Sequence, residues 1–174
     1  MKVLLMGHPN VGKSVVFNRL TGSNVSESNY PGTTVDYTKG YMRMGRKEME
    51  LIDVPGTFSL EPKDKAEEVA VKMLNENKDS VVVCVTDSTK IERGLYLALE
   101  IIERGYPVVI ALNMWDVAED KKIQIDVEKL QQILGLPVVP TIAISGEGIK
   151  ELVSRIKEAT SVKIEGVMKN VGGS

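Results

Sequence analysis

The sequence is poor in the features that mark secreted, membrane-spanning and nucleic-acid-binding proteins. It has one cysteine, Cys84, so no disulfide can form within the chain, and a reducing compartment fits this usage. No apolar run approaches the roughly 18 residues of a transmembrane helix, and the N-terminus lacks a signal-peptide pattern. The formal net charge is −2 without any basic block, which argues against nucleic acid as a constant partner. We therefore expect one soluble domain from these 174 residues.

The first segment carries a phosphate-binding loop between a strand and a helix. Residues 2–6 form a short apolar strand, residues 15–20 continue as a helix, and GHPNVGKS at 7–14 lies between them. The glycines let N–H groups point inward at a phosphate, and the helix N-terminus adds a positive end. Lys13 can reach β- and γ-phosphates, and the Ser14 hydroxyl can ligate Mg²⁺. This context predicts a nucleoside triphosphate site and disfavours a glycine-rich turn that arose by chance.

Apolar runs and helix-period segments alternate along the rest of the chain. We expect strands at 40–44, 48–53, 80–86, 107–112 and 137–142, and helices at 64–75, 91–104, 126–134 and 148–159. A tight turn at 45–47 makes the first two of these strands an antiparallel hairpin. The order predicts an α/β fold of the P-loop NTPase type: a doubly wound, mostly parallel six-stranded sheet with one antiparallel edge strand and helices on both faces. The tail 161–174 has no strong pattern, so it is expected to be disordered or to lead into an absent helical and membrane part.

Polar residues follow the predicted strands at the edge where such a sheet binds its ligand. Asp53 ends one strand and can hold Mg²⁺ through a water, while the Gly56 N–H can bond a γ-phosphate. A plain strand-ending turn is the alternative for both residues. Asn113 and Asp116 follow another strand, and a carboxylate there can accept the N1–H and N2–H₂ of guanine, which adenine does not offer. A helix N-cap is the alternative role for Asp116.

Two further loops complete the predicted nucleotide site. The loop 22–38 is long and polar, and either Thr33 or Thr34 can close over the nucleotide with its hydroxyl on Mg²⁺. The backbone of residues 143–145 can touch guanine O6, although an ordinary strand-to-helix loop explains this segment nearly as well. The predicted nucleotide-binding residues are Asn10, Val11, Gly12, Lys13, Ser14, Val15, Pro31, Gly32, Thr33, Thr34, Asp53, Gly56, Asn113, Met114, Asp116, Ala143, Ile144 and Ser145.

Residues 1–160 resemble the G domain of FeoB, the ferrous iron transporter family. The resemblance rests on GHPNVGKS at 7–14, NYPGTTV at 29–35, DVPGTFSL at 53–60 and ALNMWD at 111–116. It implies a GTP-binding and GTP-hydrolysing switch that regulates ferrous iron transport at the cytoplasmic face of the cell membrane. Its implied partners are guanine nucleotide and the helical regulatory and transmembrane domains of the full-length protein, with a homo-oligomer left open. The sequence departs from the family at Tyr30, at Thr33 and at the loop 143–145.

The resemblance also implies roles for single residues. Thr34 rather than Thr33 takes the Mg²⁺ position, with Ser14 and Asp53 as the other Mg²⁺ residues. Asn10 resembles the asparagine that helps to hold K⁺ in potassium-stimulated GTPases, and a simple turn residue is its alternative. The implied catalytic set is Lys13, Thr34 and Gly56.

Position 57 bears on the rate of the implied reaction. Ras-like enzymes carry a glutamine there that orients the attacking water, whereas this chain has Thr57. A threonine is shorter, so we expect slow intrinsic GTP hydrolysis, with the water placed by backbone groups or by a partner. The resemblance of Asn10 implies that K⁺ stimulates the reaction. Two other functions stay open. One is a ribosome-assembly or RNA-modifying GTPase, which the charge balance and the sequence NMWD at 113–116 disfavour. The other is a nucleotide-dependent regulatory module whose hydrolysis is incidental.

Overall fold

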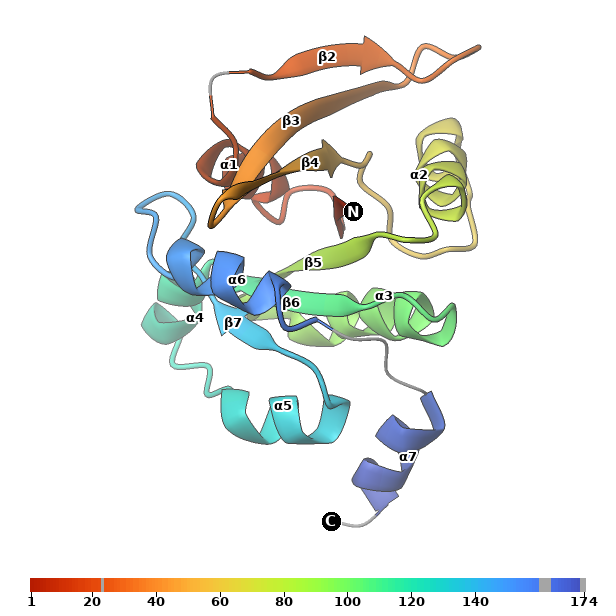
Figure 1. The fold of residues 1–174 in the computed structure, drawn as a ribbon. Coiled ribbons are helices and arrows are strands. Elements are labelled where there is room, and N and C mark those ends of the chain that lie inside the picture. The colour runs from red at the N-terminus through yellow and green to blue at the C-terminus, as the bar shows by residue number, and fades with distance from the viewer. Residues whose placement is uncertain (23, 160–163, 173–174) are drawn as a thin grey trace.

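The computed structural model describes residues 1–22, 24–159 and 164–172, which fold around one seven-stranded sheet (Figure 1). The strands are β1 (Lys2–Gly7), β2 (Ser26–Asn29), β3 (Asp36–Met44), β4 (Lys47–Asp53), β5 (Val81–Asp87), β6 (Val108–Asn113) and β7 (Val138–Pro140). The helices are α1 (Lys13–Leu20), α2 (Lys65–Glu76), η1 (Ser88–Lys90, a 3₁₀ turn), α3 (Ile91–Glu103), α4 (Trp115–Asp120), α5 (Val127–Leu134), α6 (Ile149–Ile156) and α7 (Ile164–Gly172).

The order of the strands places β1 in the middle of the sheet. The sequence across the sheet is β2-β3-β4-β1-β5-β6-β7, and all neighbours from β4 to β7 pair in parallel. β3 runs against β4 and β2 runs against β3, so the antiparallel pairing is confined to one edge, as predicted. The carboxyl ends of the parallel strands meet at one edge of such a sheet, where ligands bind.

The sheet has seven strands, so the predicted count of six is wrong. The additional strand, β2, has the sequence SESN and is exposed at every position. It therefore carries none of the apolar alternation by which a half-buried strand is predicted. It lies within residues 22–38, which we expected to be a loop throughout.

Helices cover both faces of the sheet, as the sequence predicted. Val3 and Leu5 of β1 point to the face that α1 and α6 cover, where Phe17 and Leu152 are also buried. Leu4 of β1 points to the opposite face, which α2, α3, α5 and α7 cover. This alternation along β1 follows from the two-residue period of a strand, and burial on both sides explains its uninterrupted apolar sequence.

The tail contains a helix that the sequence did not reveal. α7 contacts α5 and α3, and its Val167 side chain is buried in the core of that face. Asn170 Nδ2 donates to the Ile133 carbonyl at the end of α5 at 3.0 Å. Residues 164–172 of the expected tail are thus helical and packed on the domain, while residues 160–163 and 173–174 lie outside the described residues.

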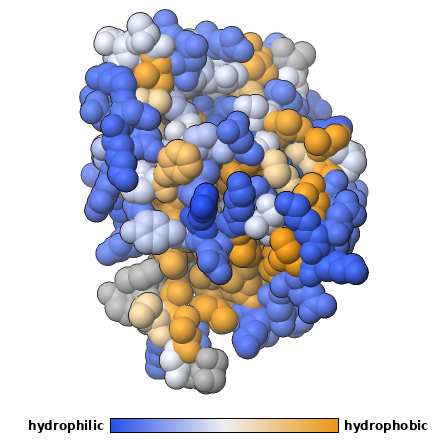
Figure 2. Space-filling view, turned by 180° about the vertical axis from the view of Figure 1, so that it is seen from behind, coloured by the Kyte–Doolittle hydropathy of each residue, from blue (hydrophilic) through white to orange (hydrophobic). Residues whose placement is uncertain are grey.

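Apolar surface remains on the outside of this same layer. Figure 2 shows apolar side chains gathered low on the back face, at the height of α5 and α7 in Figure 1. Leu95 and Leu99 of α3 and Val127 and Leu130 of α5 are only partly buried against the core. None of the helices in the described ranges is long and apolar enough to cross a membrane.

Candidate functional site

The predicted phosphate loop leaves the sheet at Gly7 and enters α1 at Gly12. A side chain at Gly7 would place its Cβ 2.5 Å from the Val85 carbonyl oxygen of β5, so only glycine fits this exit. Gly12 is the N-cap of α1 with φ 83°, and Asn10 also has a positive φ of 67°. Positive φ costs glycine nothing and asparagine little. The local sequence thus produces the curled backbone that the motif predicted.

Lys13, Ser14 and Asp53 converge at the mouth of this loop. Lys13 Nζ contacts Asp53 Oδ1, and both side chains are 11% exposed. Ser14 Oγ lies 3.5 Å from the other carboxylate oxygen of Asp53. α1 supplies the first two residues and the end of β4 supplies the third. The arrangement joins a cation for phosphate to two hard oxygen donors of the kind that Mg²⁺ prefers.

The segment after β4 packs directly on the phosphate loop. The Gly56 Cα lies so close that an added Cβ would be 3.2 Å from the Pro9 nitrogen, and the Thr57 N–H donates to the Gly7 carbonyl at 3.0 Å. The Thr57 side chain is fully buried, and its hydroxyl donates to the Ser59 carbonyl at 2.6 Å. Thr57 is therefore committed to the segment's own turn and presents no side-chain group to a ligand.

A buried carboxylate fixes this segment to α2. Glu67 is 5% exposed and accepts hydrogen bonds from the Phe58 N–H at 3.2 Å and the Lys63 N–H at 2.8 Å. Asp64 caps the same helix by accepting from the Glu67 N–H. Glu67 could not be singled out from the sequence, because an acidic residue in the first turn of a helix is commonly a solvated one.

Asn113 joins three loops of the site. Its side chain is buried, with Nδ2 donating to the Val11 carbonyl at 3.0 Å. Its Oδ1 accepts from the Thr141 hydroxyl at 3.1 Å and from the Ala143 N–H at 3.0 Å. The Asn113 amide thus ties the phosphate loop to Thr141 and to the loop 143–145. Thr141 was missed, although it lies just after β7 at the strand-end position where such residues gather.

Asp116 lies exposed in the first turn of α4. The N-cap of this helix is Met114, with φ 58°, so the alternative role of Asp116 as an N-cap is wrong. The Asp116 carboxylate makes no hydrogen bond or ion pair within the described part of the chain. It is therefore free to accept hydrogen bonds from a ligand. Trp115, between Met114 and Asp116, is partly buried against the core, and its indole N–H donates to the Glu119 carboxylate.

Arg19 holds the loop 143–145 from the other side. It lies in the last turn of α1, where Nε donates to the Ala143 carbonyl at 2.9 Å and Nη2 donates to the Ile144 carbonyl. Ala143 is buried while the Ile144 side chain is 82% exposed, and Ser145 donates to the Ile142 carbonyl. No sequence motif marked Arg19, because its partners lie more than a hundred positions away.

Residues 31–34 form a turn between β2 and β3 that lies beside α2. Thr33 is committed to this turn, since its hydroxyl donates to the Tyr30 carbonyl at 2.8 Å and accepts from the Val35 N–H at 3.1 Å. The Tyr30 hydroxyl donates to Glu76 of α2, and this bond raises the pKa of Tyr30. Thr34 is exposed, and its hydroxyl makes no hydrogen bond to the residues described. The structure thus does not bring Thr34, Pro31 or Gly32 together with Ser14 and Asp53.

The sheet order, the phosphate loop and the strand-end residues define the fold of a P-loop GTPase G domain. The G domain of T. maritima FeoB, a solved structure, is 41% identical and superposes with a TM-score of 0.84 over 91% of this chain and 97% of that chain. A GDP-bound mutant of S. thermophilus NFeoB is 38% identical, with a TM-score of 0.85 over 92% of this chain and 63% of that chain.

The family model described as Ferrous iron transport protein B matches residues 1–156. The chain therefore belongs to the FeoB family. It is 42% identical, over 153 residues, to the Fe(2+) transport protein A/Fe(2+) transporter FeoB fusion protein of Porphyromonas gingivalis. It covers 18% of that relative and 24% of the Fe(2+) transporter FeoB of Leptospira biflexa, so it spans about a quarter or less of these curated relatives.

Proposed function

We propose that residues 1–160 are a G domain that binds GTP and GDP and hydrolyses GTP slowly. The observation that carries this proposal is Asn113, which joins the phosphate loop to the loop 143–145 beside the free carboxylate of Asp116. One network thus links a phosphate-binding end to a base-binding end. The GDP-bound S. thermophilus relative and a GMPPNP form of the T. maritima cytosolic domain support the choice of ligand.

Mg²⁺ fits the residues at the mouth of the phosphate loop. The Ser14 hydroxyl and the Asp53 carboxylate would hold it, and Thr34 would join them only after the turn 31–34 moves from its place beside α2. Bound Mg²⁺ neutralises charge on the β- and γ-phosphates. When the nucleotide binds, the Lys13 ammonium would leave the Asp53 carboxylate and pair with the phosphates. The backbone N–H groups of the loop and of Gly56 would orient the γ-phosphate. Backbone groups or a partner would place the attacking water, because the Thr57 hydroxyl is bonded to the Ser59 carbonyl.

We further propose that K⁺ stimulates the reaction through Asn10. Asn10 is exposed on the phosphate loop, and its side chain makes no hydrogen bond to the described residues. A monovalent cation beside the phosphates would supply charge that no arginine in 22–38 can supply. Hydrolysis should be faster in K⁺ than in Na⁺ at equal ionic strength. Equal rates in the two salts would rule this role out.

We propose the cellular role and location of this domain from its family. Its nucleotide state would regulate ferrous iron transport at the cytoplasmic face of the membrane, through helical and transmembrane parts of a longer protein. The iron would be the cargo of those parts. Within the described residues, no group of three or more His, Cys, Asp or Glu side chains could hold a metal ion. A regulatory module with incidental hydrolysis is the second candidate, and the buried Thr57 side chain favours it.

The base-reading residue offers the most direct test. Asp116→Asn should weaken GDP binding by about a hundredfold and improve binding of xanthosine diphosphate, since the pairing of donors and acceptors is reversed. Asp120→Asn, at the other end of the same helix, is the matched control and should bind GDP as the unchanged protein does. Isothermal titration calorimetry measures both. If Asp116→Asn keeps full GDP affinity, or if ATP binds as tightly as GTP, the guanine assignment fails.

A further inference from the structure

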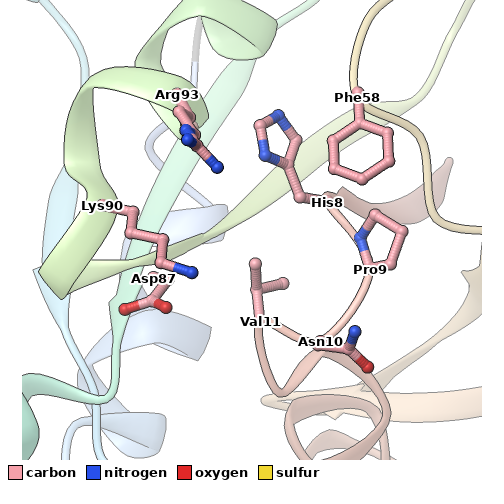
Figure 3. A pocket seen from close by; sticks show the side chains of 9 residues that line it. His8, Pro9, Asn10, Val11, Phe58, Asp87, Lys90 and Arg93 are labelled. Carbon is pink, nitrogen blue, oxygen red and sulfur yellow. The ribbon is translucent and has the colours of Figure 1, made fainter.

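A cavity lies beside the phosphate loop, between that loop and the start of α3 (Figure 3). Its volume is about 250 Å³. It is lined from one side by the phosphate loop and the segment after Gly56, and from the other by the end of β5, η1 and α3. The residues that give it its chemistry are His8, Asn10, Phe58, Asp87, Lys90 and Arg93.

Two cations of this cavity have no anionic partner. Lys90 and Arg93 take part in none of the ion pairs or side-chain hydrogen bonds found among the residues described. Figure 3 shows the nitrogen ends of both side chains directed into the space in front of the phosphate loop. Two unpaired cations that share one hollow repel each other, so an anion between them would be stabilised by both.

The carboxylates nearby are already engaged. Asp87 Oδ1 accepts from the Thr89 N–H at 2.8 Å and from the Thr89 hydroxyl at 2.7 Å, as the cap of η1. Glu67 holds the backbone of the segment after Gly56 through both of its oxygens. Neither acid lies within ion-pair distance of Lys90 or Arg93, so both cations are unpaired in the described structure, and they outnumber Asp87, the one carboxylate that lines the cavity.

His8 adds a polar atom that lacks a partner. Its ring lies 5.1 Å from the ring of Phe58, and Nε2 is buried without a hydrogen bond in the described structure. A buried polar atom of this kind is costly unless a ligand or water satisfies it. In Figure 3 the ring stands between Arg93 and Phe58, at the edge of the cavity.

We propose that this cavity is a binding site for inorganic phosphate, held by Lys90 and Arg93 with His8 at its edge. Its volume is below the roughly 300–1,000 Å³ of sites for larger ligands, so a small oxyanion with some water suits it. The site shares Asn10 and Val11 with the phosphate loop. It is thus placed to hold the phosphate that GTP hydrolysis releases. That role rests on the proposed function, whereas phosphate binding itself does not.

The single histidine of the chain makes the test direct. The protein is first saturated with GDP and Mg²⁺, which fill the phosphate loop. Inorganic phosphate is then added while the ring-proton signal of His8 is followed by NMR, with chloride at equal ionic strength as the reference. We expect a saturable shift with phosphate alone.

Charge-matched variants locate the binding. The double variant Lys90→Gln/Arg93→Gln should weaken phosphate binding by about tenfold for each cation removed. Arg46→Gln/Lys129→Gln removes the same charge from exposed positions outside the cavity and should titrate like the unchanged protein. A shift that chloride reproduces, or that survives in Lys90→Gln/Arg93→Gln, overturns the proposal. GDP binding, measured for every variant, shows that it is folded, and its failure in the unchanged protein counts against the proposed function alone.

Discussion

Replacing Asn113 by alanine should weaken both the fold and the nucleotide site. The Asn113 side chain is 4% exposed and makes three hydrogen bonds, to the Val11 carbonyl, the Thr141 hydroxyl and the Ala143 N–H. A hydrogen bond contributes about 1 kcal/mol net, and a buried partner left unsatisfied costs about 1–3 kcal/mol. Because two of the three partners belong to the backbone and cannot turn away, we expect Asn113→Ala to lose about 3–5 kcal/mol of unfolding free energy.

Urea denaturation followed by the fluorescence of Trp115 measures this loss. Trp115 is the only tryptophan and lies two residues from the substituted position, in a helix of the same edge. Asn75→Ala is the matched control, since Asn75 is exposed and bonds only Arg104 at 3.2 Å. The control should lose less than about 0.5 kcal/mol.

Adding GDP separates the two effects of Asn113→Ala. A ligand at a hundred times its dissociation constant stabilises the folded state by about 2.7 kcal/mol. The unchanged protein and Asn75→Ala should gain this increment, while Asn113→Ala should gain little, because its phosphate loop and loop 143–145 are no longer joined. If Asn113→Ala unfolds within about 0.5 kcal/mol of the control, the buried network does not stabilise the site and the reasoning is refuted.

Two further predictions concern the buried side chains of Thr57 and Cys84. Thr57→Ala should leave the GTP hydrolysis rate unchanged while costing about 1 kcal/mol of stability, because its hydroxyl bonds only the Ser59 carbonyl; a hundredfold fall in single-turnover rate would contradict this. Burial raises the pKa of Cys84 to about 12, so the folded thiol should resist Ellman's reagent at about pH 8 and react fully in urea. The folded pKa lies above the unfolded one, so the stability that this thiol contributes is complete below about pH 9 and falls as the pH rises toward 12. Rapid labelling of the folded protein would show that Cys84 is accessible.

The elements that sequence reasoning located are those with local causes. β5 consists mostly of β-branched residues, and it begins and ends within one residue of the predicted strand. The phosphate loop follows from glycine positions next to a strand and a helix. β2 and α7 were not predicted because neither carries a distinctive sequence pattern. β2 is exposed throughout, and α7 depends on contacts with α5 and α3.

The residues of the candidate site likewise fall into those that the sequence predicted and those that it did not. Asn113 and Asp116 were identified because polar side chains at strand ends are informative in a parallel sheet. Arg19 and Thr141 were not, since their roles come from contacts with residues distant in sequence. The position of Thr34 depends on where the β2–β3 turn packs, and Tyr30 anchors that turn to Glu76 of α2. Local sequence fixes the shape of this turn but not its partner.

Helix α1 touches both ends of the candidate nucleotide site. It begins with Lys13 at the phosphate loop and carries Arg19, which grips the loop 143–145, in its last turn. Its eight residues form a rigid strut of about 12 Å. A displacement at one end must therefore tilt or shift the other, so loss of a γ-phosphate and loosening of the base are expected to be mechanically linked. The coupling between the two ends would then depend on a helix that contains none of the predicted base-reading residues.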